Sequence, residues 1–321
     1  MTQSPSWWNV PWIVVLAGTC TSGSLGRNPD YDQGWSRGPA LPEPIQEIQA
    51  AVLHGRIYCA GGFHAGSAVS TAVYRLDSTS AARWGRIAEL PEARHHMPLA
   101  TVDDSLYAIG GLGPNGMTAV ATLWLYDERN DRWLERAPLP EPRGASAAGI
   151  IDGRIFVVGG FGPGRRLLDS IAIYDPATNR WRHGAPIPTP RDHLAAAVIG
   201  GKLYAAGGRP LDPDRNFKVL EAYDPAADAW TKRTPMPTAR GGLAAVAFQN
   251  RIYTYGGETT RKVFAEHEVF DVATDVWSSA PPLPTPRHGL AAATLDNRIY
   301  LIGGGPRAGL AQTNVVEVYA P

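Results

Sequence analysis

The chain has 321 residues, and its 30 Lys and Arg balance its 30 Asp and Glu, so the net charge is zero. That balance argues against a general nucleic-acid-binding protein, which would carry a basic surplus or stripe. The 35 Gly and 28 Pro break long helices and favour short strands joined by turns. Two cysteines, Cys20 and Cys59, are too few for a disulfide framework. No apolar run is long enough to span a bilayer.

Residues 1–30 share no pattern with the rest of the chain. Residues 7–18 (WWNVPWIVVLAG) are apolar and precede small and polar residues, as in a secretory signal peptide. No Lys or Arg comes before this stretch, and Asn9 and Pro11 interrupt it, which opposes that interpretation. Cys20 after LAGT resembles a lipoprotein cleavage site displaced by one residue. We expect a secreted or periplasmic protein if residues 1–20 are a signal, and otherwise a cytoplasmic protein with an irregular N-terminal arm.

From residue 31 onward the sequence is a sixfold repeat. Glycine pairs recur at intervals of 47–49 residues and begin at Gly61, Gly110, Gly159, Gly207, Gly256 and Gly303. A tryptophan stands 26 residues before each pair, at Trp35, Trp84, Trp133, Trp181, Trp230 and Trp277. An aromatic residue stands three residues before each pair. A period of this length indicates a repeat architecture.

Each repeat predicts four short strands. An Ala-rich strand comes first, followed by a tight turn, an aromatic strand that runs into the glycine pair, a strand ending in Tyr–Asp or Phe–Asp, and the Trp strand. Such a four-stranded unit predicts one blade of an all-β propeller. The strand at Trp35 has no blade of its own, and the last repeat lacks its Trp strand. We therefore expect Trp35 to pair beside residues 315–319, complete the sixth blade and close the ring.

The glycine pair, the Tyr–Asp or Phe–Asp step and the spaced Trp resemble the Kelch repeat over residues 31–321. The resemblance implies a six-bladed β-propeller of the galactose-oxidase-like kind, preceded by the separate segment 1–30. It also implies that the Ala-rich strands lie innermost and that the repeated Trp and aromatic residues are core. Bacterial members of the family include sialic acid mutarotases, which interconvert the anomers of an acidic sugar without a cofactor.

One face of the predicted propeller carries the candidate ligand-binding residues. An arginine stands 16 residues before five of the six glycine pairs, at Arg94, Arg143, Arg191, Arg240 and Arg287. His95, His288, Arg209 and Arg261 are placed on the same face. Five arginines around one opening could bind an anionic sugar or an acidic peptide. A residue that recurs in the repeat pattern is more often structural, so both interpretations of the arginines stand.

The two positions that follow each repeated arginine vary between repeats, and they supply the candidate catalytic residues. His96 and His193 occupy the second position, Glu47 occupies the equivalent position after Ile45 in the first repeat, and Asp192 occupies the first position. Carboxylates and imidazoles are the usual general acids and bases. These four residues could therefore serve a mutarotase. Solvated loop charges are the alternative interpretation of such residues.

Other chemistry has no support in the sequence. Copper oxidases similar to galactose oxidase need a Tyr crosslinked to Cys, and Cys59 has no matching partner that we can assign. The iron motif Glu-x3-Asp-x3-His of plant specifier proteins is absent, as are zinc motifs. We therefore predict no metal and no cofactor. The leading prediction is a monomeric, non-catalytic module that holds a protein or anionic ligand at the channel mouth. The alternative is a carbohydrate-active enzyme such as a sialic acid mutarotase.

Overall fold

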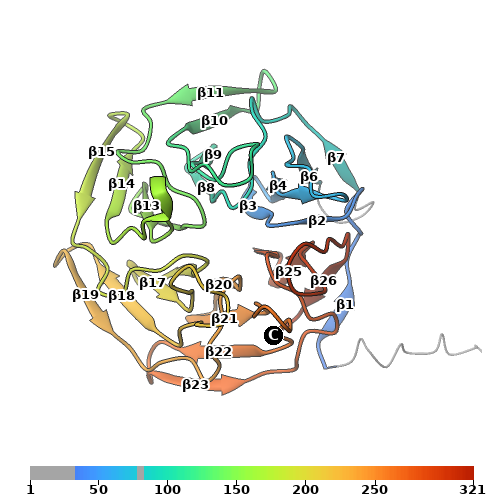
Figure 1. Ribbon diagram of the computed structural model, residues 1–321, viewed down its shortest axis with the longest axis vertical. Helices are drawn as coiled ribbons and strands as arrows, with labels where there is room; N and C mark the ends of the chain where they lie inside the picture. Colours follow the sequence, from blue (N-terminus) through green and yellow to red (C-terminus); the bar gives the residue numbers. More distant parts are fainter. Residues whose placement is uncertain (1–32, 78–82) are drawn as a thin grey trace, which may run out of the picture.

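The computed structural model describes residues 33–77 and 83–321, so the predictions for residues 1–30 lie outside the described residues. The described chain forms six four-stranded antiparallel sheets arranged in a ring (Figure 1), as the repeat predicted. In the described part of the chain, one 3-10 turn, η2 (Pro163–Arg165), lies in a loop of the third blade. Within these residues no helix is long and apolar enough to cross a membrane.

Five blades are continuous in the sequence, and each runs from its innermost to its outermost strand. Blade one contains β3 (Gln49–Leu53), β4 (Arg56–Ala60), β6 (Val73–Leu76) and β7 (Trp84–Arg86), and blade two contains β8 (Leu99–Val102), β9 (Ser105–Ile109), β10 (Leu123–Asp127) and β11 (Arg132–Arg136). Blade three contains β12 (Ala147–Ile151), β13 (Arg154–Val158), β14 (Ile171–Asp175) and β15 (Arg180–Gly184). Blade four contains β16 (Ala195–Ile199), β17 (Lys202–Ala206), β18 (Leu220–Asp224) and β19 (Ala229–Lys232), and blade five contains β20 (Ala244–Phe248), β21 (Arg251–Tyr255), β22 (His267–Asp271) and β23 (Val276–Ser279).

The sixth blade joins the two ends of the chain. It consists of β24 (Ala291–Leu295), β25 (Arg298–Ile302), β26 (Val316–Tyr319) and, as its outer strand, β1 (Trp35–Arg37). Trp35 lies opposite Tyr319, so the predicted closure is confirmed. Because β1 covers the edge of β26, the ring has no unpaired β26 edge on which another chain could add a strand.

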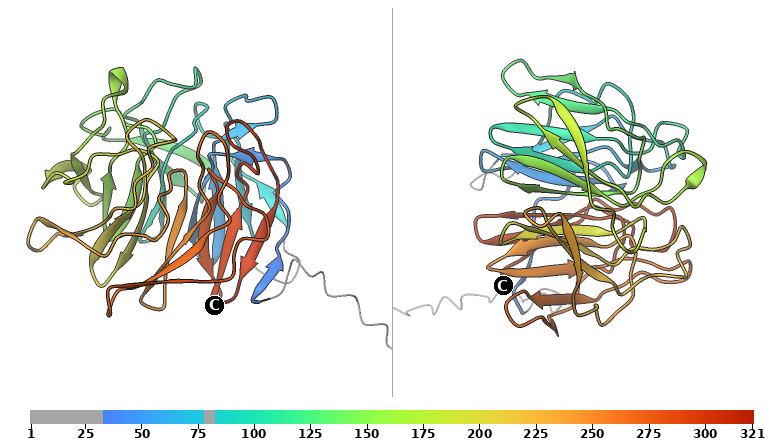
Figure 2. Two further views of the ribbon diagram at one scale, coloured as in Figure 1. Left: turned by 60° about the horizontal axis from the view of Figure 1, so that its bottom comes forward. Right: turned by 90° about the vertical axis from the view of Figure 1, so that its left-hand side faces the viewer.

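The repeated residues have the structural roles that their periodicity predicted. The Ala-rich first strands of neighbouring blades pack against one another around the axis, where large side chains would collide. The repeated tryptophans join the blades, because each indole N–H donates to a main-chain carbonyl of the preceding blade, with N···O distances of 2.8–3.2 Å. The strands run across the disc and the loops gather on its two faces (Figure 2).

Trp35 should hold the closing strand in place. Its indole is 5% exposed, and its Nε1 donates to the carbonyl of Pro281 at 3.2 Å. Trp35→Phe keeps a ring but removes this donor, so we expect the free energy of unfolding to fall by about 1–2 kcal/mol in denaturant titration. Trp277→Phe removes the equivalent bond to Thr234 at a more solvated position and serves as the control. An equal loss of unfolding free energy in both variants would show that Trp35 contributes no more to stability than a tryptophan of a continuous blade.

Candidate functional site

A closed ring of main-chain hydrogen bonds surrounds the mouth of the channel. One residue from each blade contributes, and we call these six residues the mouth ring: Glu47, His96, Ala145, His193, Gly242 and Gly289. Each N–H donates to the carbonyl of the mouth-ring residue in the preceding blade, with N···O distances of 2.7–3.4 Å. All six have φ between 51° and 68°, a region that favours glycine. The ring thus keeps Glu47, His96 and His193 in a conformation that costs each about 1–2 kcal/mol.

A second tier of residues stands just outside the mouth ring. The residue before each mouth-ring residue forms an antiparallel bridge with the residue directly after a glycine pair. The six residues after the glycine pairs are Phe63, Leu112, Phe161, Arg209, Glu258 and Gly305. They are apolar in blades one to three, and two of the other three are charged. The site is therefore built from two unlike halves.

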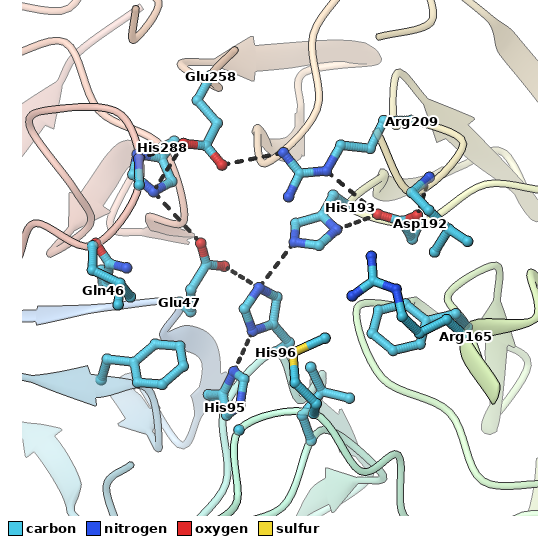
Figure 3. A pocket seen from close by; sticks show the side chains of 18 residues that line it. Gln46, Glu47, His95, His96, Arg165, Asp192, His193, Arg209, Glu258 and His288 are labelled. Carbon is cyan, nitrogen blue, oxygen red and sulfur yellow. Dashed lines mark hydrogen bonds and ion pairs between the residues drawn. The ribbon is translucent and has the colours of Figure 1, made fainter. Parts of the chain in front are cut away.

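These tiers line a pocket of about 330 Å³ at the mouth of the channel. His95, His96, His193, His288, Glu47, Asp192, Arg209 and Glu258 form its polar part, together with Gln46 and Arg165 (Figure 3). The apolar wall of the pocket consists of Phe63, Leu112, Phe161 and Leu211. At its rim lie two exposed side chains, Met117 (51% exposed) and Leu310 (59% exposed). A concave site with apolar walls and a few convergent polar groups is the usual form of a small-molecule pocket.

The polar side chains are linked to one another in a closed circuit (Figure 3). Glu47 Oε2 lies 3.0 Å from His96 Nε2, and that nitrogen lies 2.9 Å from His193 Nε2. His193 Nδ1 contacts the Asp192 carboxylate, which lies 3.5 Å from Arg209. Arg209 is 3.1 Å from Glu258, and His288 Nε2 lies 3.4 Å from Glu258 and 3.7 Å from Glu47. We call these seven side chains the polar circuit.

Burial shifts the pKa values of the polar circuit. Burial, together with the nearby Glu258, raises the pKa of Glu47 to about 7, against the opposing effects of His288 and Arg209. Burial and the neighbouring histidines hold the pKa of His96 well below its usual value. Burial alone would raise the pKa of Asp192, but the hydrogen bond from His193 and the charge of Arg209 lower it. The pocket thus contains neutral imidazoles and carboxyl groups of unequal acidity.

The repeated arginines lie elsewhere, and their guanidinium groups do not line the pocket. Arg94, Arg143, Arg191, Arg240 and Arg287 are each at most 1% exposed. Arg191 donates to the carbonyls of Gly207, Thr189 and Ala205 and pairs with Glu221 at 2.6 Å. Arg240 and Arg287 pair in the same way with Glu268 and Glu317. This placement supports the structural interpretation and removes the main reason to expect a strongly positive mouth.

Arg94 and Arg143 use other partners, because their blades lack a glutamate on the third strand. Arg143 bonds to Ser170 and to Glu141, and Arg94 bonds to Glu92 and lies over the ring of Trp124. Three carboxyl groups, those of Glu47, Asp192 and Glu258, line the pocket instead.

The other candidate residues divide into two groups. The structure brings Glu47, Asp192, His96 and His193 together with His95, His288 and Arg209 in one pocket. Arg261 is exposed and does not line it. Sequence reasoning missed Phe63, Leu112 and Phe161, because an apolar residue beside a strand resembles core. Their shared position directly after the glycine pair was the signal that could have found them.

Comparisons with known proteins identify the repeat. The KLHDC2/KLHL20/DRC7 Kelch-repeats domain matches residues 136–304, and the Kelch motif matches residues 93–140. No curated protein matches the chain. A solved structure titled "Structure of YjhT" superposes with a TM-score of 0.76 at 18% identity, covering 87% of this chain and 96% of that one. At that identity the likeness shows the fold alone. The chain belongs to the Kelch-repeat family of β-propellers.

Proposed function

We propose that this Kelch propeller is a binding module that holds a small carbohydrate in the mouth pocket. The observation that carries the proposal is the division of the pocket into an apolar, aromatic half and a polar half. A sugar ring has the same division, with C–H faces that pack on aromatic rings and hydroxyl groups that need donors and acceptors. Phe63, which is half-buried, supplies the accessible aromatic ring of the lining, whereas Phe161 is only 2% exposed. The polar circuit supplies carboxylates and imidazoles. The pocket volume of about 330 Å³ suits a small molecule.

The rim favours a sugar that carries a carboxylate. Arg165 is exposed, and its guanidinium carbon lies 5.4 Å from the centroid of the Phe161 ring. Arg209 is already paired with Asp192 and Glu258, so its charge is offset within the polar circuit, and Arg165 is the arginine of the lining left to meet an anionic ligand. We therefore expect acidic sugars to bind more tightly than neutral ones, by about fivefold for one exposed charge pair of roughly 1 kcal/mol.

The test is binding of four probe sugars, measured by saturation-transfer NMR and calorimetry. We expect glucuronate and N-acetylneuraminate to bind more tightly than glucose and N-acetylglucosamine. Phe63→Ala should weaken binding of all four sugars, whereas Arg165→Ala should weaken binding of only the two acidic sugars. Arg261→Ala is the control, because this arginine is exposed but lies outside the pocket. Failure of all four sugars to bind would contradict the proposal, and would leave a protein partner seated on Met117 and Leu310 as the remaining use of the face.

Mutarotation of the bound sugar is a second candidate, favoured by one feature of the geometry. A carboxyl group, Glu47, and an imidazole, His96, face each other at 3.0 Å in the pocket, as a proton donor and acceptor would. Anomer exchange of N-acetylneuraminate can be followed by NMR. If the protein is a mutarotase, Glu47→Gln and Asp192→Asn should keep sugar binding and lose the acceleration. Exchange at the uncatalysed rate with wild-type protein would leave binding as the function.

A further inference from the structure

Three potential metal ligands from three different blades converge in the mouth pocket. Glu47, His96 and His193 each present one ligand atom, and these atoms all lie within 4.8 Å of one another. Their side chains point toward a common centre (Figure 3). His96 lies 49 positions after Glu47 and 97 positions before His193, so no short sequence motif predicts the three together.

The groups around these three residues orient the imidazoles as metal sites do. The Asp192 carboxylate accepts the hydrogen bond from His193 Nδ1–H, which leaves a lone pair on Nε2 directed at the centre. His96 Nδ1 contacts His95 Nδ1, so its Nε2 is also directed inward. In metal sites the second nitrogen of a ligating histidine typically donates to a carboxylate, a carbonyl or water, and this fixes the tautomer.

The three ligand atoms share too few protons to satisfy one another. With His193 protonated on Nδ1, its Nε2 is an acceptor, and Glu47 Oε2 is a second acceptor whenever its carboxyl group is ionised. The His96 Nε2 lies 2.9 Å from the first and 3.0 Å from the second, and it can supply one proton at most. A cation at the centre would satisfy all three lone pairs. Tetrahedral bonds of about 2.0–2.1 Å place ligand atoms about 3.3 Å apart, so the two contacts of His96 Nε2 need to open by a few tenths of an ångström. The ligand atoms of Glu47 and His193 lie within 4.8 Å of each other.

The mouth ring keeps these donors at backbone positions that suit glycine better. Blades five and six have Gly242 and Gly289 at the equivalent positions, whereas Glu47, His96 and His193 occupy the same left-handed conformation. Gly289 also makes room for the ligand set, because a Cβ there would overlap the Glu47 carboxylate. Residues held in costly conformations gather at functional sites, where the surrounding structure imposes the geometry.

We propose that Glu47, His96 and His193 bind a divalent first-row transition metal ion, with Zn²⁺ as the reference ion. Two imidazoles and one carboxylate suit Zn²⁺ and its neighbours, whereas Mg²⁺ and Ca²⁺ prefer oxygen ligands alone. Three protein ligands leave a coordination position open toward the pocket. The inference goes beyond the proposed function, because metal uptake can be measured without any sugar. Metal ligation and proton transfer need the same atoms of Glu47 and His96, so a bound ion would exclude the mutarotase mechanism.

The experiment uses the full chain after chelator treatment and dialysis. We expect calorimetric titration with ZnCl₂ to show one ion per chain, and Co²⁺ to give visible absorption bands that Zn²⁺ abolishes. His96→Gly and His193→Gly each remove a ligand while keeping a residue suited to the ring conformation. Each substitution should weaken Zn²⁺ binding by more than about 100-fold. Loss of a residue that only hydrogen-bonds to a metal ligand already weakens metal binding by up to about 100-fold, and loss of a ligand itself should weaken it more. Circular dichroism and the unfolding midpoint check that the variants remain folded.

Two matched variants serve as controls. Ala145→Gly changes a mouth-ring residue that offers no ligand, and His183→Ala removes an exposed histidine of β15, so both should bind Zn²⁺ as the wild type does. Absence of Zn²⁺ uptake by the wild type would overturn the proposal, and so would unchanged uptake in both glycine variants. Sugar binding by the metal-free protein tests the proposed function separately, so the two can fail independently.

Discussion

Arg191→Ala is expected to lower the free energy of unfolding by about 3–5 kcal/mol, the usual cost of removing one partner from a buried ion pair. Arg191 and Glu221 are both 0% exposed, so the substitution leaves the glutamate charge in the protein interior without its cation. It also removes the donor for the carbonyls of Gly207, Thr189 and Ala205. Denaturant unfolding followed by circular dichroism measures the loss.

Arg94→Ala is the matched control for this prediction. Arg94 holds the same repeat position, but its partner Glu92 is 62% exposed and stays hydrated when the arginine is removed. We expect a smaller loss of roughly 1–3 kcal/mol, from the lost hydrogen bonds and the contact with Trp124. If Arg191→Ala unfolded at the wild-type midpoint but lost sugar binding, the repeated arginines would belong to recognition and the structural interpretation would be wrong.

Gly256→Ala should have the largest effect of any single substitution considered, a loss of more than about 4 kcal/mol. Gly256 is the first glycine of the fifth pair, with φ of 65°, and a Cβ there would overlap the main-chain oxygen of Arg287 in the next blade. The obstacle is backbone rather than a flexible side chain, so neither blade can relax without breaking the contact between them. We expect the variant to accumulate in the insoluble fraction and any soluble protein to unfold at a strongly reduced denaturant midpoint.

Gly200→Ala separates this clash from the cost of the backbone conformation itself. Gly200 has φ of 58°, but nothing lies within 4 Å of a Cβ built there. Its substitution should cost only about 1–2 kcal/mol, the ordinary penalty for an L-residue in the left-handed region. A Gly256→Ala protein as stable as Gly200→Ala would show that close approach of the blades is not why the repeat uses glycine there.

The blades and their closure could be predicted because they depend on features that every repeat shares. Each glycine pair allows two neighbouring blades to approach closely, and each Trp forms a hydrogen bond to the preceding blade. The incomplete ends then had to combine, because an isolated Trp35 strand and an exposed β26 edge are both unfavourable. Spacing alone was sufficient for this part of the structure.

The site depends on differences between repeats, and those could be predicted only in part. Glu47, His96, His193 and Asp192 were found because they depart from the repeat at adjacent positions. Their side-chain directions could not be predicted, because the left-handed backbone of the mouth ring sets them. The repeated arginines posed the opposite problem, since their position was clear but their partners, such as Glu221, lie 30 residues later on another strand.

The central claim is that ligands bind in the mouth pocket, and the histidines can test it directly. The chain has eight histidines, of which His95, His96, His193 and His288 line the pocket and His54, His64, His183 and His267 do not. Selective ¹⁵N labelling of histidine side chains allows both groups to be followed by NMR while N-acetylneuraminate is added. Our account predicts that resonances of the first group shift with saturation and that those of the second stay fixed. Saturable shifts confined to His54 or His183, with the pocket histidines unchanged, would contradict it.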